Sequence, residues 1–97
     1  MIAVIFEVIP KSQGKEEYLR IAAELKPILE KIDGFISIER FQSMNDSNKL
    51  LSLSFWQNEQ AVKTWREQSN HQQAQNKGQS TLFDDYRIRV ATVNRDY

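Results

Sequence analysis

His71 is the residue in this chain best suited to proton transfer. It is the only histidine among 97 residues, and imidazole is the side chain whose ordinary pKa lies nearest neutrality. Trp65 precedes it by six residues, and an indole can stack on a flat ring while an imidazole exchanges a proton with it. The simpler alternative is that Trp65 packs in the core and His71 is a solvated residue at the start of a helix. The spacing alone favours that alternative.

Glu7 is the one charged residue inside an otherwise apolar segment, Ile2–Ile9. A carboxylate there is costly to bury alone, so it must find a cation, line a wet cavity or take up a proton. Arg87 and Arg89, on the segment predicted to form the neighbouring strand, are its expected partners in a cross-strand ion pair. The same guanidinium groups could instead bind the phenolate or carboxylate of a substrate.

Composition excludes several classes of site. With no cysteine and one histidine, the chain lacks a thiolate nucleophile, disulfides and the ligands of the usual zinc site. It contains no glycine-rich phosphate loop and no nucleophile-elbow motif. The 13 basic and 13 acidic side chains leave no net charge that would attract nucleic acid or an anionic membrane. We therefore expect no metal site and no nucleic-acid partner.

The length fits one domain, residues 1–97, because two independent cores would each be too small to be stable. The longest apolar run, residues 1–9, is interrupted by Glu7 and is far shorter than the roughly 20 residues of a membrane helix. The absence of cysteine fits a reducing compartment. We expect a soluble cytoplasmic protein with no membrane partner.

The first half of the chain predicts a strand, a helix and a hairpin. Ile2–Ile9 is β-branched and apolar, as in a strand. From Lys15 to Ile32 the apolar residues recur at helical spacing, and Gly34 provides a left-handed stop. Two strands, Phe35–Gln42 and Lys49–Gln57, then flank a polar turn.

The second half predicts a helix and a final strand. Asn58 is the expected N-cap of a helix that carries Trp65 on its inward side. A second capping signal at Ser69–Asn70 predicts a break, followed by a short helix from His71 to about residue 76 that ends near residue 78. The last strand is predicted at Phe83–Val93.

The order β-α-β-β-α-β is that of the ferredoxin-like α+β fold, a four-stranded antiparallel sheet with both helices on one face. Right-handed crossovers place the first strand between the third and the last. This topology leaves the second face of the sheet without a helix.

The apolar pattern suggests that the second face is also covered. Ile2–Ile9 is apolar at both its odd and its even positions, which face opposite sides of a sheet. In the first strand of the hairpin, Ile36 and Ile38 are expected on one side and Phe35 and Phe41 on the other. The apolar residues of the next strand also fall on both sides: Leu51, Leu53 and Phe55 on one, and Leu50 and Trp56 on the other. A homodimer in which two such sheets meet as a barrel would cover this face. The alternative is a monomer with scattered exposed apolar residues.

Several short motifs together resemble one known family. They are Gly34-Phe35 at a strand opening, Ser54-Phe55-Trp56 at a hairpin end, the helical segment 59–66 (EQAVKTWR), His71, and the closing segment 86–90 (YRIRV). In this order they resemble the antibiotic biosynthesis monooxygenase family over essentially the whole chain. The resemblance implies a ferredoxin-like homodimer.

The resemblance also implies candidate site residues. Trp65, His71 and Arg87 match positions that line the substrate cavity of the cofactor-free oxygenases, whereas Ala61 replaces a polar amide that those enzymes hold. His71 and Trp65 are thus the catalytic candidates, and the substrate-binding candidates are Arg87, Glu7 and Trp56.

Haem degradation, another activity of the family, is a poorer match. Glu7 occupies the place where the haem degraders use an asparagine, and their axial histidine lies further beyond its tryptophan than His71 lies beyond Trp65.

These resemblances lead to one expectation and one alternative. We expect a cofactor-free monooxygenase or oxidase acting on a small phenolic or quinol-type aromatic molecule, without flavin or metal. His71 would take the proton, Trp65 would hold the ring, and Arg87 would stabilise the developing oxyanion. The alternative is a non-catalytic dimeric domain that binds a small ligand or serves a stress response.

Overall fold

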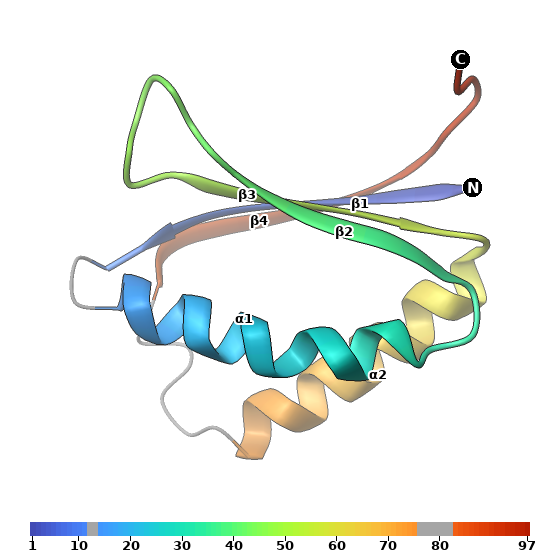
Figure 1. The fold of residues 1–97 in the computed structure, drawn as a ribbon, viewed down its shortest axis with the longest axis horizontal. Helices are drawn as coiled ribbons and strands as arrows, with labels where there is room; N and C mark the ends of the chain where they lie inside the picture. The colour runs from blue at the N-terminus through green and yellow to red at the C-terminus, as the bar shows by residue number, and fades with distance from the viewer. Residues whose placement is uncertain (12–13, 76–82) are drawn as a thin grey trace.

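The computed structural model describes residues 1–11, 14–75 and 83–97, and within these it describes the backbone alone at residues 69–75 and 83. Four strands and two helices alternate in the order β-α-β-β-α-β (Figure 1). Their bounds are β1 Ile2–Pro10, α1 Lys15–Glu30, β2 Phe35–Gln42, β3 Leu50–Trp56, α2 Glu59–Gln75 and β4 Phe83–Thr92.

The strands form one sheet in the order β2-β3-β1-β4, and every neighbouring pair is antiparallel. Both helices lie on the same side of this sheet, which leaves the other side without a helix (Figure 1). The ferredoxin-like fold and the place of β1 between β3 and β4 are therefore confirmed. Below, the two sides are called the helix-facing side and the helix-free side.

The helix ends follow local sequence signals. Asn58 Oδ1 accepts a hydrogen bond of 2.9 Å from the Ala61 amide at the start of α2, as the capping signal predicted. Gly34 has a φ of +94°, the left-handed geometry predicted for it, although α1 itself already ends at Glu30. The Gly34 carbonyl accepts a 2.7 Å hydrogen bond from the Gln57 amide, which fixes the entry to β2 beside the exit from β3.

Two local predictions are wrong. The expected break at Ser69–Asn70 is absent, and α2 continues through His71 to Gln75. Serine and asparagine favour a helix start but do not break a helix, and this segment contains neither proline nor glycine. The predicted stop near residue 78 lies outside the described residues.

The second wrong prediction is the regular alternation of β2, which was expected to place Phe35 and Ile38 on opposite sides. A bulge between Phe35 and Ser37 breaks this alternation. Phe35 and Ile38 consequently both pack against the core on the helix-facing side. Phe41 pairs with Leu51 on the helix-free side.

Among the described residues, the core between sheet and helices includes two apolar clusters. The larger joins residues of β1, β3 and both helices: Ile2, Val4, Leu29, Ile32, Trp56, Ala61 and Val62. The smaller, at the other end of the sheet, joins Val8, Tyr18 and Leu50, with Phe6 packed against it. These clusters show which side of each strand faces the helices, and this decides where the candidate site residues lie.

Candidate functional site

The helix-facing side of β4 carries apolar side chains that the helices leave exposed. Tyr86, Ile88 and Val90 pair with Val8, Phe6 and Val4 of β1, respectively. Paired residues of an antiparallel sheet point to the same side, and Val4 and Val8 are core residues. Tyr86, Ile88 and Val90 nevertheless keep 61%, 37% and 46% of their surface exposed. We call these three residues the β4 strip.

Aromatic rings extend the β4 strip at one end. The Phe6 ring lies between Tyr86 and Tyr18, with centroid distances of 6.1 Å and 6.5 Å and tilted planes. These separations are typical of favourable aromatic pairs. A buried tyrosine of α1, a phenylalanine of β1 and an exposed tyrosine of β4 are thus in continuous contact across the helix-facing side.

Trp65 lies nearer the other end of this layer. It is half-buried, packs against the larger core cluster, and stacks at 5.8 Å and 38° on Trp56. Trp56 has no exposed surface, and its Nε1 donates a 2.9 Å hydrogen bond to Ser54 Oγ. Trp65 can therefore meet a ligand at the edge of the core, whereas Trp56 supports it from behind.

His71 lies further along the same continuous helix as Trp65. Its side chain lies outside the described residues, so its predicted role as a base stays a prediction. The unbroken α2 does place both candidates on one rigid element that runs from the Trp56 end of the sheet toward its opposite end (Figure 1).

Arg87 and Glu7 lie on the helix-free side. The register pairs Glu7 directly with Arg87. Neighbouring residues of a strand point to opposite sides of the sheet. Glu7 and Arg87 therefore point away from the side that holds the β4 strip and the β1 core residues. The structure thus places Arg87 and Glu7 on the other side of the sheet from Trp65, whereas the resemblance implied that Arg87 and Trp65 line one cavity. The sequence could not reveal this separation, because Tyr86 and Arg87 are adjacent and only the strand register decides which of them faces the helices.

Glu7 forms ion pairs with two cations. Its carboxylate lies 3.4 Å from Arg89 Nη1 and 3.6 Å from Lys49 Nζ. The pair with Arg89 confirms a prediction; Lys49 was missed, although its place just before β3 brings it beside β1. Partial burial raises the pKa of Glu7, but the charges of Lys49 and Arg89 outweigh this effect and lower it. Glu7 is therefore a stably ionised member of a charged cluster.

Arg40 is a charged residue on the helix-facing side. It pairs with Ser52, which pairs in turn with Phe6. Its guanidinium interacts with the Tyr18 hydroxyl. Burial raises the pKa of Tyr18, and the positive charge of Arg40 lowers it by a smaller amount. Arg40 Nε is buried without a hydrogen-bond partner. Neither Arg40 nor Tyr86 was predicted as a site residue. The only signal for either was the side of the sheet that it shares with its partner residues.

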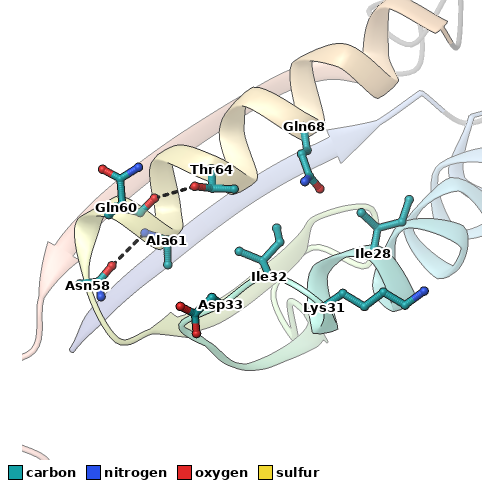
Figure 2. Close-up of a pocket in the computed structure, with 9 residues that line it drawn as sticks. All are labelled: Ile28, Lys31, Ile32, Asp33, Asn58, Gln60, Ala61, Thr64 and Gln68. Atoms are coloured by element: carbon teal, nitrogen blue, oxygen red, sulfur yellow. Dashed lines mark hydrogen bonds between the residues drawn. The ribbon is translucent and has the colours of Figure 1, made fainter.

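A groove of about 520 Å³ separates the end of α1 from the start of α2. Ile32 and Ala61 form its floor, while Lys31, just after the end of α1, and Gln68 of α2 lie at its rim (Figure 2). Of the predicted site residues whose side chains the structure describes, Glu7, Trp56, Trp65 and Arg87, none lines it. The groove is thus distinct from the surface beside Trp65.

The described part of the chain lacks two other features, a membrane-spanning helix and a metal-binding cluster. No helix there has the length and apolar character needed to cross a bilayer. No three His, Asp or Glu side chains there are grouped so that they could share a metal ion. The candidate site is accordingly a surface of aromatic and aliphatic side chains on β1, β4 and α2.

Comparison with known proteins identifies the family. The family model for antibiotic biosynthesis monooxygenases matches residues 1–77. The chain is 43% identical over 93 residues to "Jasmonate monooxygenase ABM" of Pyricularia oryzae, but spans only 43% of the length of that protein. It is 30% identical over 93 residues to the uncharacterized protein YqjZ of Bacillus subtilis, 79% of whose length it spans.

A solved structure agrees at the level of the fold. SnoaB, described as a cofactor-independent oxygenase from Streptomyces nogalater, superposes with a TM-score of 0.80 at 10% identity. The match covers 98% of this chain and 94% of SnoaB. With the family model covering most of the sequence and two relatives at 30% identity or more, this chain belongs to the antibiotic biosynthesis monooxygenase family.

Proposed function

We propose that the protein is a cofactor-independent monooxygenase that acts on a small ring-bearing molecule bound between α2 and the β4 strip. The observation that carries the proposal is the exposed apolar surface of the β4 strip on the side of the sheet that otherwise forms the core. Small-molecule sites are lined mostly by apolar and aromatic side chains with a few polar groups, as this surface is. The monooxygenase named for the P. oryzae relative and the oxygenase named for SnoaB support the reaction class.

In the proposed reaction His71 removes a proton from the substrate, which leaves an electron-rich anion. The anion reacts with molecular oxygen; one oxygen atom enters the substrate and the other leaves as water, with the substrate supplying the electrons. Trp65, held by Trp56, packs on the substrate ring and excludes water from the reacting carbon. The oxyanion role expected for Arg87 has no support here, because Arg87 lies on the helix-free side.

The substrate is proposed as a phenol, a quinol or another cyclic molecule with an acidic proton. The jasmonate named for the fungal relative extends the set of test compounds beyond aromatic rings.

The proposal is tested by aerobic incubation of the purified protein, without added cofactors, with quinols, polyphenols, jasmonate and haem. Oxygen uptake and product mass are the readouts. We expect uptake with at least one cyclic substrate, and a product that has gained one oxygen atom from labelled O₂ and lost two hydrogen atoms, which leave in the water. Binding without oxygen uptake would support the non-catalytic alternative and reject the proposal. Conversion of haem alone would reject the assigned substrate class.

A further inference from the structure

Charge is divided sharply between the two sides of the sheet at β1 and β4. In the described pairings, Tyr86, Ile88, Val90 and Thr92 of β4 and all four β1 residues opposite them are uncharged. The charged residues of the same pairings all point to the helix-free side; they are Glu7, Asp85, Arg87 and Arg89. A ligand on the β4 strip therefore meets a sheet surface without an ion.

Arg40 is too distant to change this. It belongs to β2, at the opposite edge of the sheet, with β3 and β1 between it and β4. Strands lie about 4.8 Å apart, so the backbones of β2 and β4 are about 14 Å from each other. The guanidinium of Arg40 also already lies against Tyr18. An anionic ligand on the β4 strip would lose its hydration without gaining a cation from the sheet, which is costly.

Tyr86 is the most exposed residue of the β4 strip and its one polar group. Its ring already packs against Phe6, so its position is set from the core side. The exposed ring can stack on a ligand ring, and the phenolic hydroxyl can donate to a neutral oxygen of that ligand.

We infer that the site selects the uncharged form of its ligand, because this side of β1 and β4 carries no charge, and that Tyr86, rather than Arg87, is the β4 residue on which the ligand ring stacks. The inference rests on the proposed function for the location of the site. It also adds a constraint to that function: the substrate arrives protonated and is ionised only after it binds.

The test uses a matched pair of probes, 2-naphthamide and 2-naphthoate, which have nearly the same shape and differ in charge at pH 7. Their affinities for the full-length protein are measured by isothermal titration calorimetry. We expect the amide to bind at least tenfold more tightly. Equal or tighter binding of the carboxylate would overturn the inference, and so would failure of both probes to bind at millimolar concentration.

Variants on the two sides of β4 locate the effect. Ile88→Lys introduces a cation into the β4 strip at a partly exposed position and should shift the ratio at least tenfold toward naphthoate. Tyr86→Leu should weaken the binding of both probes severalfold, because the stacking surface is lost. Arg87→Gln, on the helix-free side, is the matched control and should leave both affinities unchanged. If the ratio of the two affinities changes in Arg87→Gln but not in Ile88→Lys, the ligand binds on the helix-free side, and the inference is overturned.

These binding results are independent of turnover. If the amide is preferred but no substrate consumes oxygen, the proposed function fails and the inference stands. If oxygenation occurs and the carboxylate is preferred, the inference fails alone.

Discussion

At the scale of single residues, the paired carboxylate of Glu7 connects structure to pH. Lys49 and Arg89 lower its pKa below the ordinary value of 4.5. A group with a lowered folded-state pKa contributes stability above its unfolded-state pKa and loses that contribution as the pH falls through the folded-state pKa. The ion pairs on the helix-free side should therefore help the fold at neutral pH and fail in acid.

Glu7→Gln should accordingly lower the melting temperature at pH 7 by about 3 °C, a modest loss because the pairs are partly exposed. Glu39→Gln, which removes an exposed carboxylate from β2, is the control and should change it little. The difference between the variants should shrink as the pH falls through the lowered pKa of Glu7, because Glu7 then becomes protonated in the parent protein too. Equal melting curves at pH 7 would show that the ion pairs add no stability.

His71 should dominate the pH dependence of any turnover, because imidazole ordinarily titrates near neutrality. His71→Ala should lower kcat by about 10²–10⁴, the usual effect of a lost general base, while the circular dichroism spectrum stays unchanged. An unaffected rate in the variant would reject His71 as the base.

Trp65→Phe provides the contrast to His71→Ala. It should raise KM and leave the pH profile in place, since it removes stacking surface but no titrating group.

At the scale of elements, the sequence predicts what depends on local periodicity and fails where register decides. The apolar spacing of α1, the Asn58 cap and the hairpin are local patterns, and all three are present. The side taken by Arg87 and the alternation of β2 are not local, because each depends on how one strand aligns with the next. One unexpected bulge at Phe35 was enough to move Ile38 to the other side of the sheet.

The connection from α1 to β2 depends on two small residues. Gly34 has a positive φ, and a Cβ added to it would lie 2.8 Å from the Ala61 Cβ. Ala61 is itself buried. The close approach of Ala61 therefore leaves no room for a side chain at position 34.

Gly34→Ala should therefore lower the free energy of unfolding by about 2 kcal/mol, measured by urea denaturation. The double variant Gly34→Ala/Ala61→Gly removes the close contact between the two Cβ atoms but retains the backbone strain. It should lose less than the sum of the two single variants. Strict additivity would show that the crowding has no energetic effect.

At the scale of the whole molecule, the helix-free side remains an apolar surface with a charged margin. Ile5, Leu51, Leu53 and Phe55 are only half-buried there, and Ile36 and Phe41 are largely exposed. Monomeric proteins seldom leave a patch of this kind uncovered. A second copy of the sheet remains the predicted cover.

The wild-type protein should sediment as a homodimer at tens of micromolar, as expected for an interface of standard size. Leu53→Arg, at the centre of the helix-free side, should yield a folded monomer, because it places a charge among apolar groups. Leu19→Arg, at an exposed position of α1, should remain dimeric. A monomeric wild type would refute this prediction.

The two buried clusters are built entirely from residues 2–62, and no described residue of β4 belongs to either. The same strand supplies the β4 strip. Selection, natural or in the laboratory, can therefore vary positions 86, 88 and 90 without changing a residue of either cluster. The scaffold and the choice of ligand are carried by different stretches of the chain, and new specificities can be sampled by changing one terminal strand of a domain that keeps its fold.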